Sequence, residues 1–434
     1  MARVTVIGGG FGGLASAARL AKLGHEVTLV ERLPTLGGAL DSISARGFTW
    51  DTGPTTTLLP GVVRDLFRKS GRQLDAELDL VAVDLIREHR FADGSSVRLP
   101  GGSRGVQYDA FEELEAGLGD LWCDYVASFA DDWDLIRRDY LERPLLPETT
   151  SKQVQRLLRS RESVYKRLRK TFRDPRLRQV AAYPFVLGGH DPRNVPAWMG
   201  MHAYVEQRFG AWTIPGGMVA LRDALAARLE TRKVRVLTET TATDVVLREG
   251  AVVAVATDSG PVDTDVVVCA IDPRRLPVLA RHVARTMPAI PPVVCHLGLD
   301  GEIPELTSEV VLHGDAELTV RPGGRAPEGG AAWTVLGRGR LSEDILNAMA
   351  RQGLDVRRHL VTRIDRSPKE QAEHWAGSPM GVLWQGRSTV TERVGPATPV
   401  PGVYAAGAHA TPGAGIPFVG LSAALVAEAI GPAR

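Results

Sequence analysis

The stretch of sequence that decides the fold is VIGGGFGGLASAARLAKLGHEVTLVERL, residues 6–33. Its pattern of apolar residues predicts a short buried strand over residues 4–7, a helix over 11–23 and a second strand over 27–31. A strand, a helix and a second strand in this order form one βαβ unit, which is typical of a parallel sheet. The sequence therefore predicts an α/β fold that begins at the N-terminus.

Three glycines in this stretch, Gly8, Gly10 and Gly13, have the spacing G-x-G-x-x-G between the first strand and the helix. The first allows a tight turn, the second lets a pyrophosphate approach the backbone, and the third lets helix and strand pack closely. Unpaired amides and the positive end of the helix dipole then face the phosphates. Glu31 ends the second strand, where a carboxylate accepts hydrogen bonds from ribose hydroxyls. This pattern predicts a dinucleotide site.

Composition limits the class of protein. A chain of 434 residues is long for one compact core, so we expect two domains, interleaved along the chain. The net charge of +1 favours no nucleic-acid partner, and the three cysteines lack the spacing of metal ligands. The apolar stretch at the N-terminus is interrupted by glycines and charges, so it predicts neither a signal peptide nor a membrane span. We expect a cytoplasmic protein.

Further strand patterns occur at residues 234–237, 245–247, 252–257, 266–270 and 403–406. Mixed and helical patterns separate them, which indicates one nucleotide-binding domain divided by inserts. We expect this domain to comprise residues 1–70, 206–290 and 376–434. The substrate-binding domain is then formed by residues 71–205 and 291–375.

Residues 152–178 form a basic amphipathic segment. They contain eleven Lys and Arg against Glu162 and Asp174, and apolar residues recur at helical spacing. The segment predicts a helix that rests on its own domain and turns a solvated face outward. The alternative is peripheral docking to an anionic membrane or to an anionic ligand.

Six segments, in this order, are similar to the bacterial-type phytoene desaturase family, a branch of the FAD-dependent amine oxidase superfamily. They are GGGFGGLASAARLAKLG (8–24), FTWDTGPTTT (48–57), FRDPRLRQVAAYPFVLGG (172–189), FGAWTIPGGMVALRDALAARL (209–229), DVVVCAIDP (265–273) and GVYAAGAHATPGAGIP (402–417). Many flavoproteins share the first segment, whereas PGGM and HATPGAGIP are more particular to this branch. The resemblance spans nearly the whole chain.

This resemblance implies a Rossmann-like FAD-binding domain of the glutathione reductase type and an interleaved α+β substrate domain over an elongated apolar cavity. The cofactor-binding residues that we expect are Gly8, Gly10, Phe11, Gly12, Gly13, Glu31, Arg32, Gly38, Ala39, Thr55, Val245, Gly407, Gly415, Ile416 and Pro417. Two features depart from the family pattern. Ala39 stands where the family commonly has an arginine, and the chain is shorter than usual. Both departures affect the expected identity of the substrate more than the expectation that the protein binds a flavin.

The segment AHATPGAGIPFVGL, residues 408–421, places glycines and prolines ahead of a helical pattern. If Pro417 occupies the first turn, its missing N–H costs nothing, and the amides of residues 413–416 point at a ligand. The positive end of this helix would stabilise negative charge on the flavin ring as the ring is reduced. The alternative is a loop that caps an ordinary packed helix.

Other residues have weaker claims to a role in the site. His409 adjoins the C-terminal loop and is a candidate proton carrier, although a histidine that only holds the loop fits the sequence equally well. The resemblance places a further group of aromatic and histidine residues near the cavity. The alternative is that these residues fill a core, because a core has the same sequence pattern. These expected substrate-pocket residues are His190, Trp198, His202, Tyr204 and Trp212.

The expected activity is hydride transfer between FAD and a largely apolar substrate, and the expected reaction is desaturation of a C–C bond. Within the same scaffold the alternatives are a saturase, an amine oxidase-like enzyme and a deazaflavin-dependent oxidoreductase. A non-catalytic prenyl-binding chaperone of related fold is the alternative from another class, and relatives of that kind have lost glycines that this chain keeps.

Overall fold

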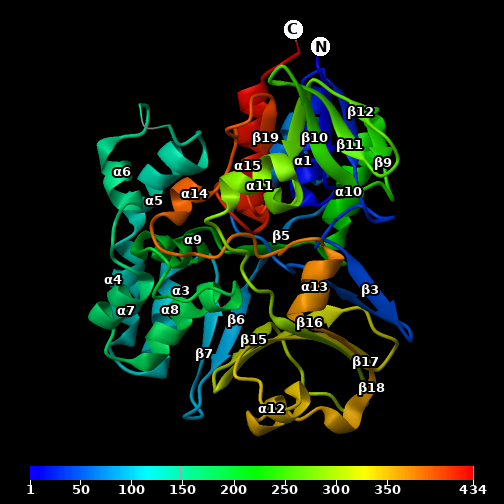
Figure 1. The fold of residues 1–434 in the computed structure, drawn as a ribbon. Helices are drawn as coiled ribbons and strands as arrows, with labels where there is room; N and C mark the ends of the chain where they lie inside the picture. The colour runs from blue at the N-terminus through cyan, green and yellow to red at the C-terminus, as the bar shows by residue number, and fades with distance from the viewer. Residues whose placement is uncertain (147, 434) are drawn as a thin grey trace.

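The computed structural model describes residues 1–146 and 148–433. Figure 1 shows three parts: a parallel sheet with its helices at the top, a layer of helices at the left, and a large mixed sheet at the bottom. Both termini lie at the top, beside the parallel sheet. The chain enters and leaves this top part more than once, so segments that are far apart in the sequence lie side by side.

The five-stranded sheet is parallel throughout and has the order β19-β13-β1-β2-β9. Its strands are β1 (Arg3–Ile7), β2 (Glu26–Val30), β9 (Arg235–Leu237), β13 (Val266–Cys269) and β19 (Val403–Ala405). One face is covered by α1 (Phe11–Lys22), α2 (Pro60–Ser70), α10 (Val219–Thr231) and α15 (Ile416–Ile430). All five strands come from the three segments expected to form the nucleotide-binding domain.

A small antiparallel sheet covers the other face of the parallel sheet. It consists of β10 (Ala242–Arg248), β11 (Ala251–Thr257) and β12 (Val262–Asp263), and it is followed by the short helix α11 (Pro277–Ala280). Val245 and Val255 pack there against Ile7 and Cys269 of the parallel strands. The first βαβ unit is therefore buried on both sides, as its continuous apolar runs require.

The seven-stranded sheet has the order β18-β14-β17-β16-β15-β6-β7. Its strands are β6 (Leu85–Arg90), β7 (Ser96–Pro100), β14 (Val293–Asp300), β15 (Glu309–Leu312), β16 (Ala316–Gly324), β17 (Gly330–Gly339) and β18 (Leu360–Arg366). All of them come from the two segments expected to form the substrate-binding domain. The hairpin of β3 (Ser42–Ala45) and β4 (Phe48–Asp51) packs against this sheet, although it belongs to the N-terminal segment. Helices α12 (Ile345–Arg351) and α13 (Pro368–His374) flank the sheet.

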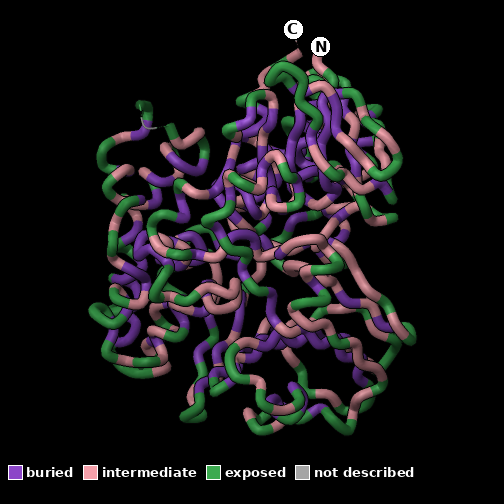
Figure 2. Tube along the Cα trace, viewed as in Figure 1, coloured by how far each residue is buried: buried purple, intermediate pink, exposed green. Residues whose placement is uncertain are grey.

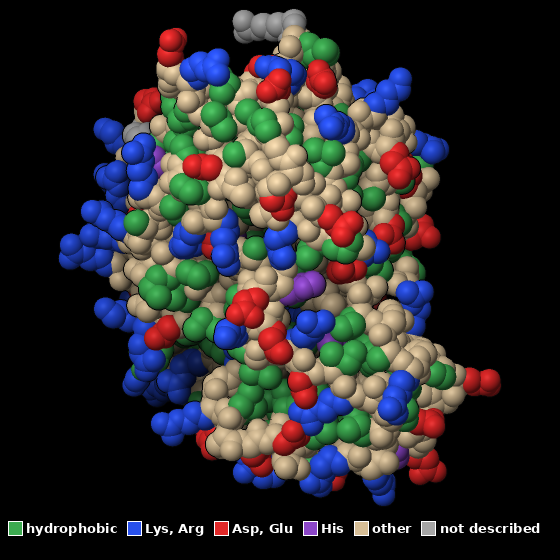
Figure 3. All heavy atoms as spheres, turned by 45° about the vertical axis from the view of Figure 1, so that its right-hand side comes forward, with side chains coloured by type: hydrophobic (Ala, Val, Ile, Leu, Met, Phe, Trp, Pro, Cys, Tyr) green, Lys and Arg blue, Asp and Glu red, His purple; other side chains and the backbone are tan. Residues whose placement is uncertain are grey.

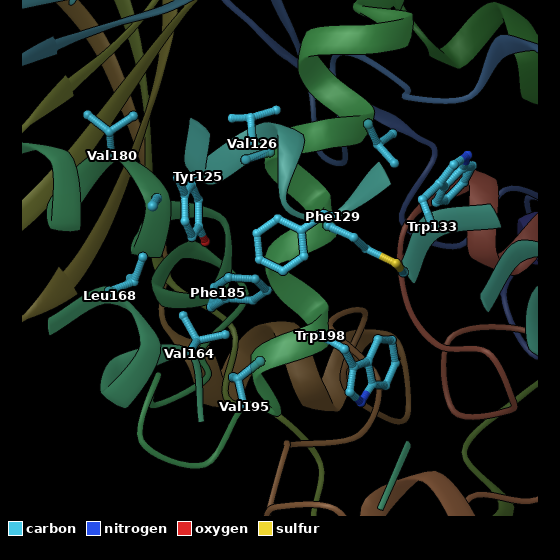
Figure 4. Close-up of a cluster of buried hydrophobic side chains, with 14 of the residues drawn as sticks. Tyr125, Val126, Phe129, Trp133, Val164, Leu168, Val180, Phe185, Val195 and Trp198 are labelled. Atoms are coloured by element: carbon cyan, nitrogen blue, oxygen red, sulfur yellow. The ribbon is translucent and has the colours of Figure 1, made fainter. Parts of the chain in front are cut away.

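The helical layer has the largest apolar core of the molecule. It contains α3 (Arg104–Leu114), α4 (Leu118–Ala127), α5 (Ala130–Ile136), α8 (Pro175–Leu187), α9 (Met201–Phe209) and α14 (Thr389–Glu392). Tyr125, Phe129, Phe185 and Trp198 converge in its centre (Figure 4). Buried residues are concentrated in this core and in the two large sheets, as Figure 2 shows. The pair of β5 (Val81–Val83) and β8 (Ala211–Thr213) connects the layer to the rest of the chain.

The basic segment 152–178 is not one helix. It forms α6 (Lys152–Leu158) and α7 (Val164–Thr171), with a break between them, and it ends in the first turn of α8. Ser163 caps α7 through a side chain that accepts from Lys166 N, which starts a new helix axis. Most apolar residues of the segment are buried, whereas eight of the eleven basic residues are exposed. Among the described residues, no helix is both long and apolar enough to cross a bilayer.

We predict that the tight contact between β1 and α1 is essential for the fold. A Cβ atom at Gly13 would lie 1.8 Å from the carbonyl oxygen of Gly8, so Gly13→Ala forces helix and strand apart. We expect the free energy of unfolding to fall by about 3 kcal/mol. Gly61→Ala on α2 is the control, because nothing lies within 4 Å of its Cβ position. Thermal unfolding followed by circular dichroism tests this, and equal midpoints for the two variants would contradict it.

Candidate functional site

One large cavity runs from the parallel sheet to the seven-stranded sheet. Its volume is about 1160 Å³, above the roughly 300–1,000 Å³ that is usual for a site holding one small molecule. One part is lined by the loops that follow β1 and β2 and by the loop before α15, and we call it the nucleotide end. The other part is lined by the helical layer and the seven-stranded sheet, and we call it the substrate end. The cavity therefore has room for a cofactor and a second ligand.

Glycine backbone forms the wall of the nucleotide end. Gly8 has a φ of +101°, and its N–H donates to Val30 O across 2.8 Å, which fixes the turn after β1. A Cβ atom at Gly12 would lie 2.7 Å from the Cα atom of Gly407, so the start of α1 and the turn after β19 are in direct backbone contact. Gly37 N donates to Gly9 O across 2.8 Å and brings the second glycine pair to the same wall.

The carboxylate of Glu31 sits at the end of β2. Its Oε2 accepts from Gly9 N at 2.6 Å, and its Oε1 accepts from Leu33 N at 2.7 Å. Glu31 is half-buried and lines the cavity. Each carboxylate oxygen keeps a lone pair for a further donor, because ionised carboxylates have about four acceptor positions. A ribose hydroxyl in the cavity is such a donor.

Thirteen of the fifteen expected cofactor-binding residues line the cavity: Gly8, Gly10, Phe11, Gly12, Glu31, Arg32, Gly38, Ala39, Thr55, Gly407, Gly415, Ile416 and Pro417. Gly13 does not, because it faces the backbone of Gly8 inside the βα contact. Val245 does not either, because its side chain is buried in the core beneath β10. The wall there is formed instead by the four residues 240–243 just before and at the start of β10. These placements leave the binding roles themselves as predictions.

The C-terminal loop presents backbone to the cavity. Gly413 and Gly415 have φ values of +139° and +100°, and α15 begins at Ile416 with Pro417 in its first turn. Residues 413–417 all line the cavity. Since the first N–H groups of a helix have no partner within the helix, the start of α15 turns unpaired donors and a positive dipole end toward the site. This geometry fits the role proposed from the sequence.

His409 lies just before this loop and is buried. Its Nε2 is 3.0 Å from Ser378 O, and its Nδ1 is 3.8 Å from Asp272 Oδ1. Burial lowers the pKa of His409, and the Asp272 carboxylate offsets this only in part. The imidazole is therefore neutral near pH 7, so it holds the loop and keeps a nitrogen that can accept a proton.

Three of the five expected pocket residues line the substrate end: His190, Trp198 and His202. Tyr204 and Trp212 lie outside the cavity. Tyr204 points from α9 into the helical core, and Trp212 donates its indole N–H to Phe209 O at 2.8 Å. Because a strand alternates its faces, the neighbours of Trp212 on β8, Ala211 and Thr213, line the cavity in its place.

Sequence reasoning missed a set of charged residues at the substrate end. Arg87 on β6 makes a bidentate ion pair with Glu206 on α9, with both N–O distances 2.7 Å. Burial raises the pKa of Glu206, but the Arg87 guanidinium outweighs this and holds it below the ordinary value. The alternation in LIREHR, residues 85–90, would have placed Arg87 on one face of a strand, but no local pattern shows that this face turns inward.

A second charged pair lies on the seven-stranded sheet. Glu309 on β15 accepts from Arg321 Nε at 2.6 Å and from the hydroxyl of Tyr183 at 2.6 Å. All three residues line the cavity. Burial raises the pKa of Tyr183, so this phenol stays protonated and donates its hydrogen to Glu309. The substrate end is therefore apolar and aromatic with paired charges, rather than purely apolar.

The chain resembles known proteins over nearly its whole length. A family model described as flavin containing amine oxidoreductase matches residues 11–431. Hydroxyneurosporene desaturase of Cereibacter sphaeroides is 29% identical, with 99% of this chain and 97% of that protein covered. The 4,4'-diapolycopene oxygenase of Methylomonas sp is 25% identical, with 99% and 98% covered.

Among solved structures, a mutant of putrescine oxidase superposes with a TM-score of 0.70 at 16% identity, covering 99% of this chain and 98% of that chain. At this identity the likeness shows the fold alone. The α/β fold with a dinucleotide-binding sheet and an interleaved second part, expected from the sequence, is thereby confirmed.

We predict that Glu31 contributes to cofactor affinity. Glu31→Ala removes a charged acceptor from the ribose position, and hydrogen bonds to charged groups contribute about 1.5–3 kcal/mol. We therefore expect FAD to bind the apoprotein about 10- to 100-fold more weakly. Glu26→Ala, at the exposed start of the same strand, is the control. Titration of flavin fluorescence measures both affinities, and an unchanged Kd for Glu31→Ala would refute the role.

Proposed function

The chain belongs to the family of flavin-containing amine oxidoreductases, and from that premise we propose that it desaturates a C–C bond of a largely apolar, isoprenoid or lipid-like molecule. The protein is an FAD-dependent oxidoreductase. The observation that carries the proposal is the single cavity that continues from the dinucleotide crevice into a wall of apolar and aromatic side chains. Full-length similarity to an enzyme named hydroxyneurosporene desaturase supports a substrate of this kind.

The residues of this chain have separable tasks in the proposed reaction. Bound FAD would supply the acceptor for the hydride that leaves the oxidised carbon. The glycine backbone at Gly10 and Gly12 would bind the diphosphate, Glu31 the ribose, and the start of α15 would face developing negative charge. The side chains of the substrate end exclude water and orient the chain of the substrate. His409, neutral and with Nδ1 unpaired among the described residues, is the candidate acceptor for the proton that is lost.

Amine oxidation on the same scaffold is the main alternative. An amine substrate requires aromatic rings whose faces are open to an ammonium group. Trp198 and Trp384 line the substrate end with ring centroids 5.9 Å apart, which resembles part of such a cage. However, the Arg393 guanidinium stands 4.4 Å from the ring centroid of Trp384. A second cation would be repelled there, which favours desaturation.

The remaining alternatives are a saturase, a prenyl-binding chaperone and a deazaflavin-dependent enzyme. A saturase would use the same residues in the reverse direction. A prenyl-binding chaperone would have no use for a dinucleotide crevice, yet Gly8, Gly12 and Glu31 keep the geometry of one. The flavin description of the family supports FAD over a deazaflavin.

We further propose that α6 and α7 dock the protein on an anionic membrane, where apolar substrates dissolve. The exposed basic residues of these helices and of the turns next to them are Lys152, Arg156, Arg159, Arg161, Lys166, Arg169, Lys170 and Arg173. Figure 3 shows Lys and Arg side chains gathered at the left-hand side of the molecule, where the helical layer lies in Figure 1. A basic surface is attracted to anionic headgroups by about 1 kcal/mol for each charge close to the membrane.

The proposed activity predicts which compounds reduce the enzyme. Under anaerobic conditions we expect phytanic acid, a saturated isoprenoid lipid that absorbs no visible light, to bleach the visible absorption of the FAD-loaded protein, because the electrons removed from it have no acceptor other than the flavin. Putrescine at the same concentration should leave the spectrum unchanged. Rapid bleaching by putrescine alone would instead identify an amine oxidase, and this outcome would overturn the proposal.

The membrane proposal predicts a loss of lipid binding on charge reversal. We expect Arg156, Arg159, Lys166 and Lys170, all changed to Glu, to lower co-sedimentation with phosphatidylserine vesicles at least about tenfold. The control makes the same change at four exposed residues of the nucleotide-binding part: Lys233, Arg235, Arg248 and Arg285. If both variants lost vesicle binding equally, the total charge of the protein would explain its attraction to the membrane. That result would contradict docking through α6 and α7.

A further inference from the structure

The wall of the substrate end holds one positive charge that makes no ion pair within the described residues. Arg393 is 8% exposed and lines the cavity. Its Nη1 donates to Pro412 O at 3.0 Å and its Nη2 to Val382 O at 3.2 Å. Within residues 1–146 and 148–433, no carboxylate lies within 4 Å of this guanidinium. Burial lowers the pKa of Arg393, but an arginine side chain stays charged in proteins.

The other buried arginines of the substrate end are different. Arg87 is neutralised by Glu206, and Arg321 is neutralised by Glu309. Three guanidinium groups therefore share two carboxylates at this end of the cavity, and the unbalanced one is Arg393. Buried charges in proteins are normally paired, because an unpaired charge loses its hydration without a compensating partner.

The neighbours of Arg393 are hydrogen-bond donors. We call Tyr140, Trp198, Trp384 and Arg393 the Arg393 cluster, since Arg393 stacks on Trp384, and Trp198 contacts both Trp384 and Tyr140 edge to face. All four residues line the cavity. In the described part of the chain, the Trp198 indole N–H has no hydrogen-bond partner, and the Tyr140 hydroxyl and the Arg393 Nε–H have at most each other. Apart from the Tyr140 hydroxyl, which can also accept, the cluster therefore offers only donors.

The backbone that carries Tyr140 is also unusual. Residues 137–141 form a π-helical turn at the end of α5, and such turns occur frequently at functional sites. Tyr140 lies in this turn, and its side chain contacts both Trp198 and Arg393.

His190 lies next to the cluster, and the positive charge of Arg393 acts on it as well. It lines the cavity close to the cluster, with its Nδ1 3.4 Å from Trp384 N. Burial lowers the pKa of His190 to about 3, and the charges of Arg393 and Arg338 add to this effect. The imidazole is thus neutral at ordinary pH, and it adds no charge that would balance Arg393.

We propose that the Arg393 cluster is a carboxylate-binding subsite, so that the substrate is an apolar chain that carries a carboxylate. A carboxylate supplies the missing negative charge and the missing acceptors together. This inference rests on the proposed function, because it names the substrate class of the same cavity. The apolar chain then extends along the aromatic wall, past residues such as Phe185 and Tyr183.

Other substrate classes fit the cluster less well. A hydrocarbon that filled the cavity would seal the Arg393 charge from water without compensating it, and a hydroxyl group would supply an acceptor but no charge. A diphosphate carries more negative charge than one guanidinium balances, and the nearby ion pairs of Arg87 and Arg321 are already complete. One carboxylate restores neutrality at this end of the cavity.

The experiment compares retinoic acid with retinol, which share a carbon skeleton and differ in the charged group. Both are titrated at submicellar concentration into the oxidised, FAD-loaded protein. Quenching of tryptophan fluorescence reports binding, since Trp198 and Trp384 lie in the cluster. We expect the acid to bind at least about tenfold more tightly than the alcohol, as for a charge-assisted hydrogen bond. Arg393→Met should abolish this preference and leave the affinity for retinol within about twofold.

Two further variants keep the test decisive. Tyr140→Phe removes the hydroxyl beside Arg393 but keeps the ring and the Arg393 charge, and we expect it to weaken the binding of the acid about threefold. Arg338→Met is the matched control, because Arg338 is another arginine held by backbone carbonyls but it does not line the cavity. It should keep the preference for the acid.

Equal affinities of acid and alcohol for the unmodified protein would overturn the inference. So would an Arg393→Met variant that shifts the flavin reduction potential while the preference for the acid persists, since Arg393 would then serve the cofactor. Because binding is measured without turnover, these outcomes are independent of whether the compounds reduce the flavin. Failure of the proposed desaturation can therefore be distinguished from failure of the carboxylate subsite.

Discussion

The structure depends on one close approach of backbone to backbone. The start of α1 and the turn before α15 meet at Gly12 and Gly407, where a Cβ atom would lie 2.7 Å from the opposite Cα atom. These residues are separated by almost the whole chain, yet their strands belong to one parallel sheet. Gly407 N is fixed by the hydroxyl of Ser422 at 2.8 Å, so its backbone has little freedom to move. The crevice exists because both helices can begin at the same edge of that sheet.

The inserts depend on this arrangement for their position. The chain leaves the parallel sheet after α2 and after α11, builds the helical layer and the seven-stranded sheet, and returns each time to a neighbouring strand. Each insert is therefore anchored at both ends on the rigid nucleotide-binding part. A cavity between such parts is the usual place for a second ligand, because the fixed sheet presents the cofactor and the inserts shape the remaining wall.

The sequence predicted the nucleotide end in detail and the substrate end only in part, for a physical reason. The constraints at Gly8, Gly12 and Glu31 are local: a turn, a close contact and a strand end, each recognisable from a few neighbouring residues. The direction of Trp212 or Tyr204 depends on which face of a short element meets the cavity, and only tertiary packing decides that. The same applies to Arg87, which the sequence does not distinguish from the surface arginines.

The buried charges distinguish this cavity from a simple apolar tunnel. Arg393 belongs to the C-terminal part of the chain, whereas Tyr140 belongs to the helical insert, so the positive cluster spans the two parts. Arg393 also holds the carbonyl of Pro412, directly before the glycine turn that leads into α15. An anion bound to this guanidinium would thus be connected by one side chain to the loop that faces the cofactor. The contacts of Arg393 would therefore position the substrate and the cofactor relative to each other. Hydride transfer needs such positioning, because its rate falls steeply when the two reactants are misaligned.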